Sequence, residues 1–496
     1  MMIHSLTLSD VLADHARSRP QVTAVVDGDV RLTYPELDAR VSRLADALAG
    51  RGTGAGDRVV WLGQNSHAVL ELLLACSRLG AVFCPANWRQ SQDELRFVLS
   101  DLTPTVVVWE PSETTAELAD PATWVRAGDD YEELVSGGSV REFPQVADTE
   151  PVLALYTAAF AGRPNAALLS SAALVAHATS LLVVRQMEPG FTFLDDGPLF
   201  HVGTMMFCLA TLQIGGTNVF TPAFDAKEVC RLIEAERVTQ AFLFGPMIDA
   251  VAAANADGAY DLSSLRFVSH SPEWDDMITV DDSPWCRSKM GGYGQTEVGG
   301  MLTFLGLAEG GAGFAGRPSP LAQVRVLDPE GDEVAAGEVG EICARGKTLF
   351  SGYFARPDLN AVKMRDGWYH TGDLGRREPD GTLTFIGPRL RMIKSGAENI
   401  YPAEVERVLK AHPAVADAAV IGVPDPVWRQ AVKAVVVRRP DADVSEKELI
   451  EHVRGQLASY KKPREVVFAD VIPKQGFTPD YDALDAAHGG GGYPGS

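Results

Sequence analysis

Short apolar runs alternate with longer stretches of helical pattern along most of the chain. β-Branched residues fill runs such as Val59–Leu62 and Val106–Trp109, which predict strands. Stretches such as Ala68–Leu79 carry apolar residues at the spacing of a helix. Strands joined by crossover helices are typical of an α/β fold, which is the fold class that we predict.

The pattern restarts near the C-terminus. Residues 385–397 combine Gly387-Pro388 with several basic side chains, and we place the domain boundary there. We therefore expect a large N-terminal domain over 1–388 and a small α+β domain over 389–480. The small domain should contain a helix, two strands and a second helix, at 403–411, 416–422, 431–438 and 445–457. We expect the Gly-rich end, 481–496, to be a flexible tail.

Composition narrows the class of protein. The chain has 496 residues, 46% of them hydrophobic, which is enough for more than one core. A formal net charge of −22 argues against binding to nucleic acid or to an anionic membrane surface. The six cysteines are scattered and predict reduced core residues. Polar residues interrupt the most apolar long window, 166–184, so we predict a buried core helix there and no integral membrane segment. The first residues do not resemble a secretory signal, so we expect a cytoplasmic location.

Two short motifs carry candidate chemistry. Tyr293-Gly294-Gln295-Thr296-Glu297 offers an aromatic ring, a hydroxyl and a carboxylate after a Gly-rich approach. Such a set is suited to stacking on a base, bonding a phosphate and holding Mg²⁺. Tyr369-His370-Thr371-Gly372-Asp373 places a carboxylate on a turn, where its oxygens can accept hydrogen bonds from ribose hydroxyls.

In this order, the two motifs resemble the core signatures of the adenylate-forming (ANL) superfamily, which comprises acyl-CoA synthetases, adenylation domains and luciferases. The resemblance covers nearly the whole chain. Further segments that carry it are 32–37, 56–59, 80–83, 198–201, 337–342, 352–353, 393–406 and 422–425.

The resemblance implies a large AMP-binding domain of packed sheets and helices, followed by a small mobile domain that rotates between two half-reactions. A carboxylate attacks the α-phosphate of ATP, and a thiol then displaces AMP. It also implies roles for individual residues. Tyr293 would lie at adenine, Asp373 at the ribose, and Gly294, Thr157, Arg389 and Lys394 would be further cofactor-binding residues. The implied catalytic residues are Thr296 at the α-phosphate, Glu297, which would also bind Mg²⁺, and His201 at the acyl pocket.

The chain departs from the family pattern where phosphates are handled. In the segment Tyr156–Ala166, alanines replace expected hydroxyl donors and Asn165 stands at a lysine position, with Arg163 as a nearby charge. Near the C-terminus, Pro479 stands where the family has a lysine that bridges the carboxylate and the α-phosphate. Lys474 is close to that position but in a different register.

Three functions follow as alternatives. The first is an ATP- and Mg²⁺-dependent ligase that activates a small aromatic or medium-chain acid, with CoA as the acceptor. The second is an enzyme similar to diazotases, which activates nitrite for transfer to an amine. The third is a homologue that binds a nucleotide with impaired catalysis. The sequence leaves the acid, the acceptor and the oligomeric state open, a homodimer being one option.

Overall fold

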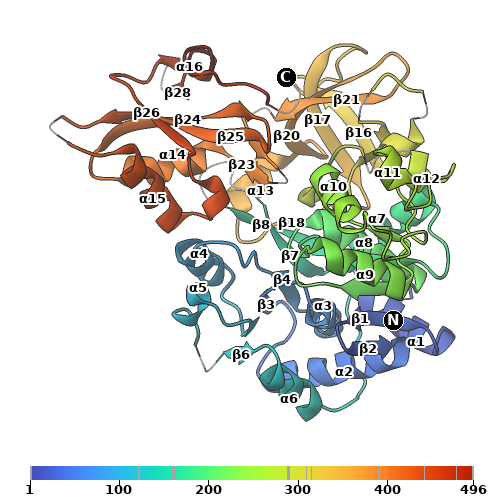
Figure 1. Cartoon of the computed structure of the whole chain (residues 1–496). Coiled ribbons are helices and arrows are strands. Elements are labelled where there is room, and N and C mark those ends of the chain that lie inside the picture. The colour runs from blue at the N-terminus through green and yellow to red at the C-terminus, as the bar shows by residue number, and fades with distance from the viewer. Residues whose placement is uncertain are drawn as a thin grey trace.

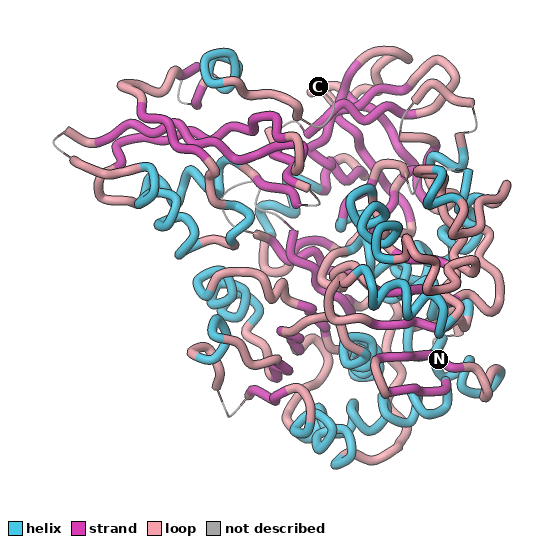
Figure 2. The backbone as a smooth tube through the Cα atoms, in the orientation of Figure 1, coloured by secondary structure: helices cyan, strands magenta, loops and turns pink. Residues whose placement is uncertain are grey.

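The computed structural model describes residues 3–120, 123–157, 164–287, 291–308, 310–313, 315–388, 391–396, 398–440, 442–475 and 478–493. These residues form a large body of sheets and helices and a smaller body that contains the C-terminal strands (Figures 1 and 2). The predicted α/β fold with a large N-terminal domain and a smaller C-terminal domain is confirmed.

A seven-stranded sheet forms the first layer of the large domain. Its strand order is β18-β8-β7-β4-β3-β5-β6, with parallel pairing from β7 through β6 and antiparallel pairing of β8. The bounds are β3 Arg58–Leu62, β4 Val82–Pro85, β5 Val106–Trp109, β6 Trp124–Arg126, β7 Pro151–Thr157, β8 Asn165–Ser170 and β18 Gly352–Tyr353. Its neighbouring helices are α1 Leu8–Ser18, α2 Tyr34–Gly50, α3 His67–Leu79, α4 Gln92–Leu102, α5 Glu113–Ala116 and α6 Asp129–Gly137.

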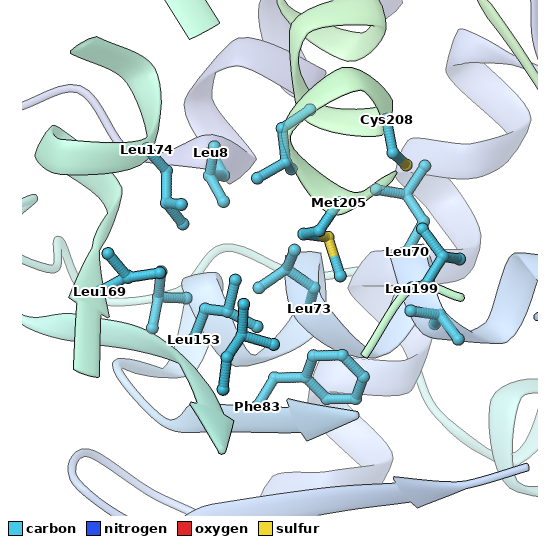
Figure 3. Packing of buried hydrophobic residues seen from close by; sticks show 14 of the residues in the cluster. Leu8, Leu70, Leu73, Phe83, Leu153, Leu169, Leu174, Leu199, Met205 and Cys208 are labelled. Atoms are coloured by element: carbon cyan, nitrogen blue, oxygen red, sulfur yellow. The ribbon is translucent and has the colours of Figure 1, made fainter. Parts of the chain in front are cut away.

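A five-stranded sheet, in the order β11-β9-β10-β1-β2, forms the second layer. Its strands are β1 Thr23–Asp27, β2 Val30–Thr33, β9 Thr192–Asp195, β10 Thr217–Phe220 and β11 Gln240–Ala241. Helices of this region are α7 Ser171–Arg185, α8 Val202–Ile214, α9 Ala226–Glu236, α10 Gly245–Ala254, α11 Pro272–Asp275 and α12 Pro284–Arg287. Helix α3 touches strands of both sheets. The shared core therefore lies between the layers, where Leu73, Phe83, Leu153 and Met205 point toward one another (Figure 3).

A third sheet, in which all strand pairs are antiparallel, carries the second motif. It consists of β16 Ala322–Leu327, β17 Val339–Gly346, β19 Met364–Arg365, β20 Trp368–Arg377 and β21 Leu383–Pro388. The first motif lies on a separate hairpin of β12 Gly294–Gln295 and β13 Gly300–Met301. Two further short strands, β14 Thr303–Phe304 and β15 Arg317–Pro318, pair with each other.

The small domain has its own sheet and its own core. The sheet order is β23-β22-β25-β24, with β26 parallel to β25. The predicted helix, two strands and helix are confirmed as α14 Pro402–Ala411, β24 Val415–Asp425, β25 Arg429–Arg438 and α15 Glu446–Gln456. Other strands are β22 Ile393–Ser395, β23 Glu398–Ile400 and β26 Glu465–Phe468. The sheets change between β21 and β22; our boundary at 388/389 stays a prediction.

The expectation of a flexible tail over 481–496 is wrong for the described part, residues 481–493. Tyr481–His488 form helix α16, whose Leu484 is fully buried in a cluster with Ile421 of β24. The hydroxyl of Tyr493 accepts a hydrogen bond from the Gly422 amide at 2.9 Å. Glycines between α16 and Tyr493 turn the chain back onto β24. The Gly-rich composition therefore did not reveal that the side chains of Leu484 and Tyr493 pack against the domain.

Within the described residues, no helix is long and apolar enough to cross a membrane. All six cysteines are free and buried, as predicted. We expected a single buried helix across 166–184, and the structure instead ends strand β8 at Ser170 before α7 begins. The hydroxyl of Ser170 caps α7 by accepting a hydrogen bond from the Ala173 amide, which explains the change of structure at that residue.

Candidate active site

The first motif lies on a hairpin whose two backbones approach closely. A Cβ at Gly294 would lie 1.9 Å from the carbonyl oxygen of Gly300 on the paired strand. Only glycine fits at such a distance. The hairpin turns through the short 3-10 helix Thr296–Val298, in which Thr296 is partly exposed and Glu297 is buried.

The fold brings the two predicted motifs together at Asp373. The hydroxyl of Tyr293 donates to Oδ2 of Asp373 at 2.7 Å, and the side-chain amide of Gln295 donates to the same oxygen at 2.6 Å. Tyr369 donates to Gln295 at 3.0 Å, and the Tyr293 ring stacks on Phe385 with centroids 5.3 Å apart. Burial raises the pKa of Asp373, while its bonds to Tyr293 and Gln295 oppose that shift. The result is a rigid, oriented carboxylate.

Glu297 is a second buried carboxylate, with 3% of its surface exposed. Its Oε1 accepts a hydrogen bond from the hydroxyl of Tyr353 at 2.8 Å. Burial raises its pKa, because the buried carboxylate loses the compensation that water would give to its charge. A hard divalent cation would supply that compensation, and carboxylate oxygens are the ligands that Mg²⁺ prefers. The site therefore fits the predicted metal.

A set of contacts that the sequence did not assign holds the turn before Asp373. Oε1 of Glu341 accepts from the Gly372 amide at 2.9 Å, and Oε2 lies 3.0 Å from Nδ1 of His370. The ammonium of Lys363 donates to the carbonyls of His370 and Thr371 at 3.2 and 3.3 Å. Glu341 lies in segment 337–342, which carries the family resemblance, and that resemblance was the only sequence feature that could have indicated a role for it.

His201 lies at the N-terminus of α8, where its Nδ1 accepts a hydrogen bond from the Gly203 amide at 3.0 Å. The residue is accessible to solvent, although much protein surrounds its ring. Desolvation by the surrounding protein, followed by the positive charge of Lys394, lowers the pKa of His201. Glu398 also acts on this histidine, so the β22–β23 hairpin of the small domain faces the predicted acyl site. The ammonium of Lys394 donates to Asn399 at 2.7 Å.

The segment predicted to bind the phosphates of ATP contributes few side-chain contacts to the site among its described residues. The hydroxyl of Thr157 donates to the carbonyl of Asn165 at 3.3 Å. The Asn165 side chain accepts from Arg356, which also pairs with Asp101 at 2.7 Å. Residues 158–163, with Arg163, and residues 389–390, with Arg389, lie outside the described residues.

The C-terminal hairpin places Lys474 opposite Pro479, the residue at the position of the missing lysine. Lys474 pairs with Pro479 across the short strands β27 Lys474–Gln475 and β28 Thr478–Pro479. Its ammonium lies 2.8 Å from Oδ2 of Asp417, on β24 of the same domain. The cation is therefore engaged within the small domain in this arrangement.

Family models match two parts of the chain. Residues 12–354 match the AMP-binding enzyme family, and residues 404–476 match the AMP-binding enzyme C-terminal domain. The chain belongs to the AMP-binding enzyme family. This AMP-binding enzyme is an ATP-dependent, AMP-forming ligase, and the predicted resemblance to adenylate-forming proteins is confirmed.

Relatives of this AMP-binding enzyme are similar over nearly their whole length. Feruloyl-CoA synthase of Amycolatopsis sp is 39% identical over 93% of this chain and 94% of the relative. Indoleacetate–CoA ligase of Aromatoleum aromaticum is 34% identical over 95% of each. The solved structure of a double mutant of o-succinylbenzoate CoA synthetase from Bacillus subtilis, bound with its product analogue OSB-NCoA, is also similar. It has a TM-score of 0.82 at 25% identity, covering 96% of this chain and 97% of that one. The chain therefore belongs with adenylate-forming ligases over both of its domains.

Proposed function

We propose that this enzyme activates an aromatic carboxylic acid as its acyl-adenylate and transfers the acyl group to CoA. The names of the two relatives above, a feruloyl-CoA synthase and an indoleacetate–CoA ligase, support an aromatic acid over a medium-chain one. The observation that carries the nucleotide half is the buried Asp373 carboxylate, held by Tyr293 and Gln295.

In the first half-reaction, a carboxylate oxygen of the acid bonds to the α-phosphorus of ATP and pyrophosphate leaves. Asp373 would accept hydrogen bonds from the ribose hydroxyls, with Tyr293 and Gly294 beside the adenine. Glu297 would hold Mg²⁺, which neutralises phosphate charge when bound. Thr296 would donate to the α-phosphate.

In the second half-reaction, the sulfur of CoA bonds to the acyl carbon and AMP leaves. His201 lies beside the small-domain hairpin that carries Lys394 and Glu398. The likeness to a structure bound with a CoA-thioester analogue extends over both domains, which supports this arrangement as the one used for thiol transfer.

The test measures pyrophosphate and AMP release from ATP and Mg²⁺ with ferulate, indoleacetate and octanoate, each with and without CoA. A further arm contains nitrite and an aryl amine in place of the acid. Release that depends on an aromatic acid, with a thioester formed only when CoA is present, is the expected result. Release with octanoate but not with ferulate or indoleacetate would show that the substrate is an aliphatic acid. Release only with nitrite and an aryl amine would establish the diazotase alternative. An enzyme that binds ATP and releases neither product would contradict the proposal.

A further inference from the structure

A buried lysine joins the two domains. The ammonium of Lys461 lies 2.6 Å from Oε1 of Glu94 on α4 and 2.9 Å from Oε1 of Glu404 on α14. Glu94 belongs to the large domain and Glu404 to the small one, which also contains Lys461. All three side chains are at most 8% exposed. Figure 1 shows α4 facing the small domain.

The ion bridge is sensitive to the separation of the domains. Burial alone would favour a neutral amine, but the charges of Glu404 and then Glu94 raise the pKa of Lys461 above its ordinary value. A buried ion that loses its partner is strongly unfavourable unless water reaches it. A rotation that moves the small domain away from α4 would leave Lys461 paired with Glu404 but separate it from Glu94.

The segment that contains Glu94 makes further contacts with the small domain. The hydroxyl of Ser91 donates to the carbonyl of Gln456 at 2.7 Å. The guanidinium of Arg89 lies 2.8 Å from Glu398 and stacks over the ring of Phe200, 5.0 Å from its centroid. Phe200 precedes His201. The segment 89–94 therefore holds the small domain where its β22–β23 hairpin faces the acyl site.

We propose that Lys461 is a positioning residue: by bridging Glu94 and Glu404 it holds the small domain in the orientation that serves thiol transfer. Its effect on the two half-reactions rests on the proposed function, whereas its effect on domain orientation does not. Loss of the Glu94 contact shifts the population toward other orientations, which favours adenylation relative to thiol transfer.

The chain offers matched variants for the test. Glu94→Gln keeps an oxygen that can accept the capping hydrogen bonds of Ser91 but removes the charge that faces Lys461. Glu36→Gln makes the same change at another capping glutamate of the large domain, which bonds Thr33 and is exposed. Lys461→Met removes the cation, and Lys462→Met removes the neighbouring, partly exposed one.

The primary measurement is single-molecule energy transfer between dyes placed through non-canonical residues at the exposed positions Ser136 and Lys447, one in each domain. We expect Glu94→Gln and Lys461→Met to lower the population with the present interdomain distance about tenfold relative to the open population, the scale of one hydrogen bond between charged groups. The Glu36→Gln and Lys462→Met proteins should match the parent. An unchanged population in Glu94→Gln would overturn the proposal.

Half-reaction rates separate positioning from loss of fold. Glu94→Gln should slow thioester formation from a preformed acyl-adenylate about tenfold and leave acid-dependent pyrophosphate exchange unchanged or faster. Equal slowing of both halves would contradict positioning. If no acid supports turnover, the proposed function fails, but the energy-transfer measurement still decides the role of Lys461.

Discussion

The ribose side and the phosphate side of the active site differ in how completely their chemistry is built. On the ribose side, Asp373 is buried and held by two hydrogen bonds from the other motif. On the phosphate side, Asn165 stands at a lysine position and is engaged by Arg356, and Pro479 stands at another. Nucleotide recognition and adenylation chemistry are therefore separable in this enzyme, and binding should be better preserved than the rate.

The largest effect should come from Asp373→Ala. The ribose hydroxyls would lose an ionised acceptor, and two such bonds are together worth roughly 3 to 6 kcal/mol. We expect the Kd for ATP, measured by isothermal titration calorimetry, to rise at least about a hundredfold. Glu330→Ala, on the exposed turn after β16, is the control. If the Asp373→Ala variant retains its affinity for ATP, Asp373 does not bind the ribose.

Pro479→Lys tests the weaker side directly. A restored cation near the α-phosphate in the transition state should contribute about 3 to 4 kcal/mol, or roughly a hundred- to a thousandfold in rate. Acid-dependent pyrophosphate exchange is the measurement, with Val471→Lys, an exposed position in the preceding segment, as the control. If exchange stays at the parent rate while ATP binding is intact, the missing lysine does not limit adenylation.

Tyr353→Phe should have an intermediate effect through Glu297. Loss of a hydrogen bond to a carboxylate, about 1.5 kcal/mol, should raise the Mg²⁺ concentration for half-maximal adenylation about tenfold. Because burial raises the pKa of Glu297 and the Tyr353 bond lowers it, the variant should have a still higher pKa.

Protons and Mg²⁺ compete for this carboxylate, which sets the direction of the pH dependence. In the parent enzyme, the half-saturating Mg²⁺ concentration should fall as pH rises above the ordinary pKa of glutamate. In Tyr353→Phe the fall should occur at higher pH. Titrations of adenylation rate against Mg²⁺ between pH 5 and 8 (roughly the range over which a raised carboxyl pKa is felt) measure both curves. If the curves of the parent and Tyr353→Phe proteins superimpose, Glu297 does not bind Mg²⁺.

The smallest effect is expected for Lys474→Met. Lys474 is half-exposed and pairs with Asp417 within the small domain, and a pair of this kind contributes about 1 kcal/mol or less. Adenylation rates should therefore change less than about twofold, with a drop in melting temperature of a few degrees at most. A loss of adenylation that Pro479→Lys restores would instead show that Lys474 substitutes for the missing lysine.

Much of the fold could be predicted because its signals are local. The β-branched runs at β3 and β5 and the four main elements of the small domain follow from hydrophobic periodicity. Periodicity failed at residues 166–170, where a strand and a helix are both apolar and only the Ser170 cap separates them. It also failed at 481–493, where two packed side chains, Leu484 and Tyr493, are diluted by glycines.

The candidate site was predicted in part. The motifs supplied Tyr293, Glu297 and Asp373, but not the contacts that orient them. Tyr353 lies in a segment that carries the family resemblance, but the sequence assigned it no role. Lys363 comes from another segment and has no sequence pattern of its own that indicates a role.

The sequence by itself determined the order of elements, the two motifs and the absence of lysine at positions 165 and 479, because each depends only on neighbouring residues. Only the tertiary structure decided that Tyr293 bonds Asp373 across a separation of 80 residues, and that Lys461 meets Glu94 across 367. Such contacts depend on how separate sheets and domains pack, and no local sequence pattern indicates which distant side chains will meet.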